Sequence, residues 1–101
     1  MPFLIETFDK EDREHIRKEA LSEHLRFLAA HAPKLIACGS KKKDDGSDLG
    51  GGIYIIDVDD RSDAEAFIAQ DPYQLAGLFE RVEIIRWNKA YVDGRCYMPT
   101  E

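Results

Sequence analysis

Hydrophobic and polar positions follow two periods along the chain, one typical of strands and one typical of helices. The segment from Met1 to Phe8 is mostly apolar and rich in β-favouring residues, and we expect a central strand there. Asp9 offers an N-cap for a helix that should run from about Lys10 to Ala32. Ala32 precedes a proline, which ends that helix. The chain therefore opens with a strand followed by a long helix.

Two further strands are predicted next, separated by a polar segment. Leu35 to Cys38 is a short apolar run that Gly39 ends or kinks. The segment from Ser40 to Gly50 is polar, and we expect a mobile hairpin connection that is long enough to serve as a lid. A glycine triplet, Gly50 to Gly52, opens the third strand, Ile53 to Val58. Because a strand and not a helix follows the triplet, close backbone approach to a neighbour or ligand fits better than a nucleotide loop.

A second helix and a last strand complete the pattern. Ser62 to Glu65 has the spacing of a capping box, and the helix that it starts should end near Gln70. Asp71-Pro72 then predicts a short helical turn, because the aspartate can cap free amides and the proline has no amide to leave unpaired. Phe79 to Tyr91 is predicted to be a long fourth strand, followed by an Asp93-Gly94 turn and a C-terminal tail.

The element order β-α-β-β-α-β predicts an α+β, ferredoxin-like fold. In that fold a four-stranded antiparallel sheet carries both helices on one face. Residues 1–101 should form a single domain, with the tail beginning at about position 93. The first, third and fourth strands are apolar on both sides, so the open face of the sheet must be covered. The sheet of a second copy is the simplest cover, and we therefore expect a homodimer.

Charge and cysteine content narrow the functional classes. The formal net charge of -6 argues against a general nucleic-acid-binding protein. No apolar run approaches the roughly 18 residues of a membrane span, and the N-terminus has no signal-peptide pattern. Cys38 and Cys96 match no metal spacing, and Cys38 is expected to be a small apolar filler in a buried strand. Two free thiols are typical of a cytoplasmic protein.

Candidate chemistry lies on the first helix. Its apolar arc is formed by Ile16, Ala20, Leu21, Leu25, Phe27 and Leu28. The middle of that arc is cationic, because Arg13, Arg17, His24 and His31 fall there at spacings of four and seven. Arg13 and His31 lie near the helix ends, where they can reach solvent. Arg17 and His24 lie mid-helix, where buried charges need partners, so His24 is either a satisfied core histidine or a functional group.

Several short stretches carry a resemblance to a known family. They are His24-Leu25, Gly39, Asp71-Pro72-Tyr73, Ala76-Gly77-Leu78 and Val82-Glu83-Ile84. Together they resemble the YciI-like (YCII-related) family over essentially the whole chain. The resemblance implies a ferredoxin-like fold that pairs into a dimeric α+β barrel. It also implies a catalytic dyad of His24 and Asp71, and Arg17 matches a frequent family arginine.

This sequence departs from the family pattern close to the implied dyad. Leu21 stands where many members carry a second arginine, and Ser40 stands where many carry proline. The segment from Ser40 to Gly50 is also shorter than in many relatives. The implied dyad is therefore kept while part of its surroundings changes. A few members of the family are linked to dehydrochlorination of hydroxylated aromatic rings.

A histidine–aspartate pair suits acid–base chemistry. An unperturbed imidazole has a pKa of about 6.5, and a carboxylate on one ring nitrogen leaves the other nitrogen as a base. This favours proton abstraction next to a carbonyl or from a phenol, hence elimination or isomerisation of a small anionic or phenolic substrate. Arg17, Tyr73 and Ser40 are the expected substrate-binding residues. Tyr73 and Trp87 would either line an apolar pocket or belong to the core.

Other functional classes remain open. The first alternative is a non-catalytic domain that binds a small ligand or a partner through the same pocket. A His24–Asp71 contact in a cleft with one open ring nitrogen would favour an enzyme, whereas a sealed His24 would not. The second alternative is haem or oxygenase chemistry, as in other dimeric α+β barrels. His15, His24 and His31 share no metal spacing, and we expect neither a metal nor another cofactor.

Overall fold

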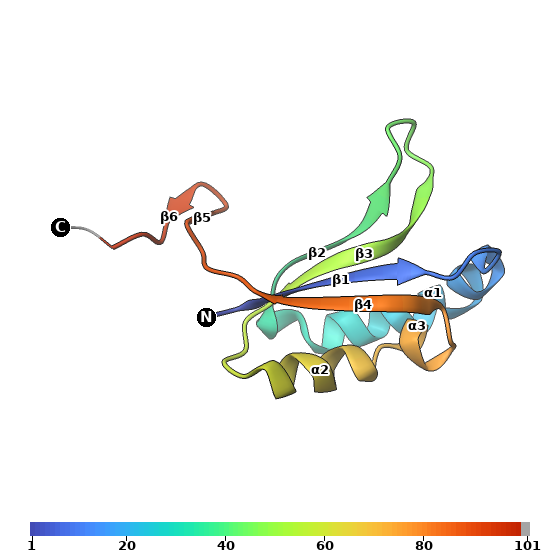
Figure 1. The fold of residues 1–101 in the computed structure, drawn as a ribbon, viewed down its shortest axis with the longest axis horizontal. Coiled ribbons are helices and arrows are strands. Elements are labelled where there is room, and N and C mark those ends of the chain that lie inside the picture. The colour runs from blue at the N-terminus through green and yellow to red at the C-terminus, as the bar shows by residue number, and fades with distance from the viewer. Residues whose placement is uncertain (100–101) are drawn as a thin grey trace.

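A single antiparallel sheet with helices on one face forms the body of the molecule (Figure 1). The computed structural model describes residues 1–99. The sheet has the strand order β2-β3-β1-β4. Its elements are β1 (Phe3–Asp9), α1 (Glu14–Ala30), a 3-10 turn (Ala32–Lys34), β2 (Leu35–Lys42), β3 (Asp48–Ile56), α2 (Arg61–Ala69), α3 (Pro72–Leu75) and β4 (Phe79–Arg86). The predicted ferredoxin-like α+β fold is confirmed.

The core lies between the sheet and the helices. β1 is the central strand and pairs with β3 on one side and with β4 on the other. Because side chains alternate along a strand, Phe3, Ile5 and Thr7 all point to the helix side, where each is buried. The rest of the buried apolar core is Tyr54, Ile56, Ala64, Phe67, Ile68, Tyr73, Leu78 and Phe79.

Both predicted N-caps of the long helices are wrong. α1 begins at Glu14, after Arg13, and Asp9 instead ends β1 with its carboxylate bonded to the side chain of Arg17. α2 begins at Arg61 after Asp60, which makes no side-chain capping bond, so Ser62 lies inside the first turn. In each case the chain enters the helix one to a few residues away from the residue with the capping pattern.

The β2–β3 hairpin is longer than the sequence predicts. Its strands extend to Lys42 and back from Asp48, so the expected connection from Ser40 to Gly50 is mostly strand. The hairpin extends away from the rest of the sheet (Figure 1). The glycine triplet does mark a close approach: a Cβ on Gly51, whose φ is +129°, would lie 1.9 Å from the carbonyl oxygen of Thr7.

The single long strand predicted from Phe79 to Tyr91 is shorter in the structure. β4 ends at Arg86, and the amide of Trp87 donates to the carbonyl of Pro2 at 2.9 Å. A separate hairpin follows, with β5 (Tyr91–Val92) paired to β6 (Arg95–Cys96) around the predicted Asp93-Gly94 turn. Within residues 1–99 no helix is long and apolar enough to cross a membrane.

The sheet face opposite the helices is open, and we call it the outer face. It carries Leu4, Ile53, Ile55 and Ile85, of which Ile53 and Ile85 are 37% and 52% exposed. Near one end of this face Phe8 lies between two cations. The centroid of its ring is 3.7 Å from the Lys41 ammonium nitrogen and 3.9 Å from the Arg81 guanidinium carbon. Leu4 lies beside Ile55 and Ile85 at the opposite end, whereas Glu6 lies between Ile53 and Glu83 in the middle. The outer face is thus apolar at one end and carries charged side chains in its middle and at the Phe8 end.

Candidate active site

Asp71 occupies the sharp corner between α2 and α3. Its backbone is extended, with φ -61° and ψ 128°, and its Oδ1 accepts a hydrogen bond of 2.9 Å from the amide of Tyr73. Pro72 fills the first helical position, where no amide donor is needed. The predicted helix cap is therefore confirmed. The side chain of Asp71 is fully buried, although aspartate is seldom buried without partners.

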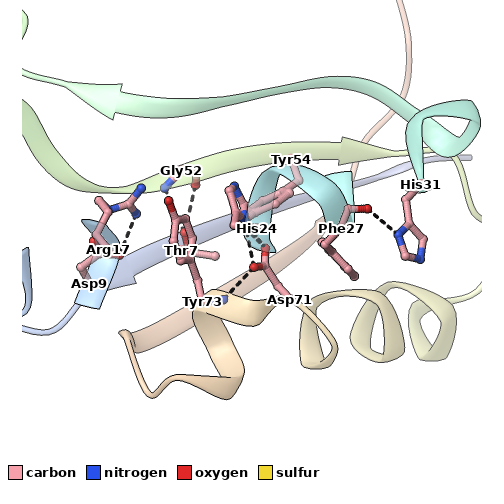
Figure 2. Close-up of polar contacts among 10 residues, drawn as sticks. All are labelled: Thr7, Asp9, Arg17, His24, Phe27, His31, Gly52, Tyr54, Asp71 and Tyr73. Atoms are coloured by element: carbon pink, nitrogen blue, oxygen red, sulfur yellow. Dashed lines mark hydrogen bonds and ion pairs between the residues drawn. The ribbon is translucent and has the colours of Figure 1, made fainter. Parts of the chain in front are cut away.

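The buried carboxylate is the meeting point of three elements (Figure 2). His24, in the middle of α1, places Nδ1 2.9 Å from Oδ1 and 3.1 Å from Oδ2 of Asp71. The hydroxyl of Tyr54, on β3, donates to Oδ2 at 2.7 Å. The expected contact between His24 and Asp71 is thus present, and it spans 47 residues of sequence.

The contact with Asp71 determines which nitrogen of His24 carries hydrogen. Both carboxylate oxygens accept hydrogen bonds, so Nδ1 donates and neutral His24 keeps the lone pair of Nε2 free. No described residue forms a hydrogen bond with Nε2, and no buried side-chain nitrogen or oxygen of residues 1–99 lacks a partner. Nε2 is therefore accessible. The imidazole also stacks on the ring of Tyr73, with centroids 3.9 Å apart and planes 15° apart.

A cavity of about 380 Å³ lies between α1 and the β2–β3 hairpin. Its lining comes from α1, β2, β3 and α3 and consists of Arg17, Lys18, Leu21, His24, Leu25, Leu28, Cys38, Gly39, Ser40, Lys42, Asp48, Gly52, Tyr54 and Tyr73. The volume falls within the range of small-molecule sites. All five residues expected at the site either line this cavity or, like Asp71, lie directly behind His24.

Arg17 supplies a fixed positive charge at the cavity wall. Its Nε and Nη2 donate to Asp9 at 2.8 and 3.1 Å, and its guanidinium carbon lies 4.7 Å from the centroid of the Tyr73 ring. Burial lowers the pKa of Arg17, but the bonds to Asp9 outweigh it and raise the pKa overall. Lys18 and Lys42 also line the cavity, together with Asp48, whose carboxylate is bonded to Lys42.

The other cationic positions of the first helix lie outside the cavity. Arg13 is exposed just before α1, as expected of a residue at the helix end. His31 follows the last turn, with Nδ1 2.9 Å from the carbonyl of Phe27 and its ring half-buried. Trp87 was expected either to line the pocket or to belong to the core, and it does neither: it lies half-buried beyond β4, outside the cavity and the core cluster. Only Arg17 and His24 of the cationic arc face the site.

Three side chains at the site were not expected there. Tyr54 was predicted only as part of an apolar strand. A buried tyrosine hydroxyl needs a hydrogen-bond partner, and this requirement could have indicated that Tyr54 contacts a polar residue. Asp9 was expected to be a helix cap. Cys38 was expected to be buried, yet it is exposed and its thiol lies at the cavity. Desolvation there raises the pKa of the Cys38 thiol to about 11, helped by the charge of Asp71.

Residues 1–99 contain no cluster of three or more histidine, cysteine, aspartate or glutamate side chains able to hold a metal ion. The chemistry that this arrangement can perform by itself is proton transfer at Nε2 of His24.

Comparison with known proteins gives the family. A model of the YCII-related domain matches residues 1–88. The chain belongs to the YCII-related domain family. Among solved structures, this YCII-related protein is similar to TftG, the 5-chloro-2-hydroxyhydroquinone dehydrochlorinase of Burkholderia phenoliruptrix AC1100, in complex with 2,5-dihydroxybenzoquinone. The TM-score is 0.79 and the sequence identity 26%, over 87% of this chain and 94% of that chain.

A more distant structure shares the fold. Protein Atu4242 of Agrobacterium tumefaciens is 12% identical, with a TM-score of 0.54 over 92% of this chain and 98% of that chain. No curated protein gives a significant match.

Proposed function

We propose that this YCII-related protein is an enzyme in which His24 and Asp71 form an acid–base pair acting on a small phenolic or anionic molecule. One observation carries the proposal: Nδ1 of His24 is bound to a fully buried carboxylate, while Nε2 is open to a cavity of about 380 Å³. A histidine that only filled the core would have both nitrogens satisfied inside it. The reaction class is elimination or isomerisation.

Proton transfer would begin at Nε2. The lone pair of Nε2 takes a proton from a substrate hydroxyl or from a carbon next to a carbonyl. The imidazolium that forms is stabilised by Asp71, whose carboxylate is already aligned with Nδ1. In an elimination on an aromatic ring, the proton is delivered to the carbon that carries the halogen, so that the phenolate oxygen becomes a carbonyl and that carbon becomes tetrahedral. Loss of a second hydroxyl proton to Nε2 then expels halide and leaves a quinone. In an isomerisation Nε2 returns the proton to another atom of the substrate.

Arg17, Ser40 and Tyr73 are the proposed substrate-binding residues. Arg17 is held by Asp9, so its charge is fixed in place to stabilise an anionic substrate or an enolate. Tyr73 forms an aromatic wall behind the imidazole, and Ser40 offers a hydroxyl from β2 on the opposite side. This arrangement suits a flat ring with an anionic oxygen directed toward Arg17.

The likeness to TftG supports the substrate class. That protein is named for dehydrochlorination of a chlorinated hydroxyhydroquinone, and its structure holds 2,5-dihydroxybenzoquinone. We therefore propose a hydroxylated, halogenated aromatic ring as the first substrate class to test. The fixed cation and the apolar residues of the cavity wall are compatible with such a ring.

The test measures chloride release from 5-chloro-2-hydroxyhydroquinone under anaerobic conditions. We expect wild-type protein to release chloride and His24→Asn to lose at least about 100-fold in kcat, the contribution typical of general acid–base catalysis. His15→Asn, which changes an exposed histidine of the same helix, is the matched control and should retain full activity.

The alternative, a non-catalytic ligand-binding domain, predicts a different result. In that case calorimetry would detect binding of hydroxylated aromatics, and neither wild type nor His24→Asn would release chloride or isomerise any of a panel of phenols and lactones. That outcome would refute the enzyme proposal while leaving the cavity as a binding site.

We also propose that the protein is a homodimer that pairs through the outer face. The apolar end of that face, where exposed Ile85 lies beside Leu4 and Ile55, supports this arrangement because a second copy would bury it. A cytoplasmic location stays a prediction.

A further inference from the structure

Tyr54 is a buried titratable residue to which the proposed mechanism gives no role. It lies on the helix side of β3, is 3% exposed, and packs edge-on against Phe67 with ring centroids 5.9 Å apart. Its hydroxyl is directed at the carboxylate of Asp71 with a separation of 2.7 Å from Oδ2. A phenol bonded to a carboxylate at this distance is a strong, charge-assisted hydrogen bond.

The two oxygens of Asp71 have different partners. Oδ1 accepts from the backbone amide of Tyr73 and lies 2.9 Å from Nδ1 of His24. Oδ2 accepts from Tyr54 and lies 3.1 Å from the same nitrogen. Among the described residues, His24 and Tyr54 are therefore the two side chains bonded to this carboxylate. The phenol and the imidazole share its negative charge.

The phenol remains a donor over the working pH range. Burial raises the pKa of Tyr54, and the charge of Asp71 and the hydrogen bond to it raise the pKa further. The other titratable groups that line the cavity beside His24 are Arg17 and Lys18 on α1, Cys38 and Lys42 on β2, Asp48 on β3 and Tyr73 on α3. A substitution of Tyr54 removes none of these groups.

We propose that Tyr54 is a positioning residue that acts through Asp71: its hydroxyl takes up part of the negative charge of the carboxylate and so limits how strongly that carboxylate stabilises the imidazolium. The inference rests on the proposed function for its catalytic meaning. The coupling itself is a property of the folded protein without substrate. Tyr54 does not act on the substrate in this scheme, because its hydroxyl is engaged with Asp71.

The direction of the effect follows from charge. A hydrogen bond donated to a carboxylate draws part of its negative charge away from other partners. Without the hydroxyl, Asp71 would interact more strongly with protonated His24, and the pKa of His24 would rise. Removal of the carboxylate charge itself has the opposite sign. Loss of the Tyr54 hydroxyl and loss of the Asp71 charge should therefore shift the titration of His24 in opposite directions.

The experiment is an NMR titration of the His24 ring in ligand-free protein, with the signal assigned by its loss in His24→Asn. We expect His24 to titrate at higher pH in Tyr54→Phe, which keeps the ring packed against Phe67, than in wild type. In Asp71→Asn we expect the pKa to fall. Tyr91→Phe, which removes an exposed hydroxyl remote from the site, is the control and should leave His24 unchanged.

A second variant covers the case in which Tyr54→Phe does not fold. Site-specific 3-fluorotyrosine at position 54 keeps the ring and hydroxyl but makes the phenol a stronger donor, so the pKa of His24 should fall. In the turnover assay, the acidic limb of the pH profile should follow His24 in each variant.

Different results separate the two proposals. An unchanged or oppositely shifted pKa of His24 in both variants overturns the role of Tyr54, whether or not the protein is active. The expected shifts in a protein that turns over no substrate would refute the proposed function and leave the coupling between Tyr54 and His24 standing.

Discussion

At the scale of single residues, Asp71 combines a local role with a long-range role in the same two oxygen atoms. Oδ1 caps α3 through the amide of Tyr73, and both oxygens face Nδ1 of His24. A fully buried charge would be costly if it were unpaired. Here the donors come from α1, β3 and α3, so the carboxylate both ties these elements together and orients the imidazole.

Cys38 shows how the same site affects a neighbouring group. Its thiol lines the cavity, and desolvation together with the charge of Asp71 raises its pKa to about 11. Since the thiolate and not the thiol is the nucleophile, Cys38 is a poor nucleophile near neutral pH. This agrees with the assignment of proton transfer, and not covalent catalysis, to the site.

The labelling of Cys38 should therefore depend steeply on pH. In a Cys96→Ser background, we expect the rate of alkylation by iodoacetamide to rise about tenfold per pH unit from pH 7 to 10, because the thiolate fraction does so below the pKa. Mass spectrometry of the labelled peptide measures this rate. A rate that levels off near pH 8.5, the ordinary value for cysteine, would contradict the raised pKa.

At the scale of elements, α1 divides its apolar residues between two surfaces. Ile16, Ala20, Phe27 and Leu28 pack against the core. Leu21 and Leu25 are 45% and 53% exposed and line the cavity instead. One broad apolar arc was predicted to face the core, and the structure corrects this by giving part of it to the site. His24 lies between the two surfaces, which explains how it is buried yet open at Nε2.

The β2–β3 hairpin forms the opposite wall of the cavity, and its path depends on Gly51. Gly51→Ala should destabilise the protein by at least about 2 kcal/mol, because a φ of +129° is strained for alanine and the new Cβ would collide with the Thr7 carbonyl. Urea unfolding measures the change. Gly39→Ala on the adjacent strand is the control, since nothing lies within 4 Å of its Cβ position. Equal stability of the two variants would contradict the tight approach.

At the scale of the whole molecule, the helices cover one face of the sheet and leave the outer face open (Figure 1). Exposed apolar patches of this kind are typical of interaction sites. The cavity lies on the other side of the sheet, between α1 and the hairpin. Pairing through the outer face would therefore leave the site accessible to a small molecule.

Ile85→Asp should convert the proposed dimer into a monomer, because a charge would replace an apolar side chain at the apolar end of the outer face. Size-exclusion chromatography with light scattering would give the mass of one chain for this variant and of two chains for wild type. Leu75→Asp is the matched control, since Leu75 is 74% exposed on α3, on the helix side. A wild-type protein with the mass of one chain would refute the dimer.

The sequence predicted the order of the elements because each depends on local signals. A mostly apolar run of β-favouring residues predicted the central strand β1, and Asp71-Pro72 predicted the start of α3. The predicted caps at Asp9 and Ser62 were wrong, although both side chains suit a helix start. The carboxylate of Asp9 binds Arg17 instead, and α2 begins at Arg61, one residue before Ser62.

The sequence by itself determined the fold class, from the periodicity and order of its elements, and its short motifs carried the family resemblance, which in turn implied the pair His24–Asp71. Only the tertiary structure decided that Tyr54 bonds to Asp71, that Arg17 is held by Asp9, and that Nε2 of His24 opens into a cavity. The physical reason is register. Which side chains meet across β1, β3 and α1 depends on how strands pair and how the helix lies over them, and local chemistry does not specify that.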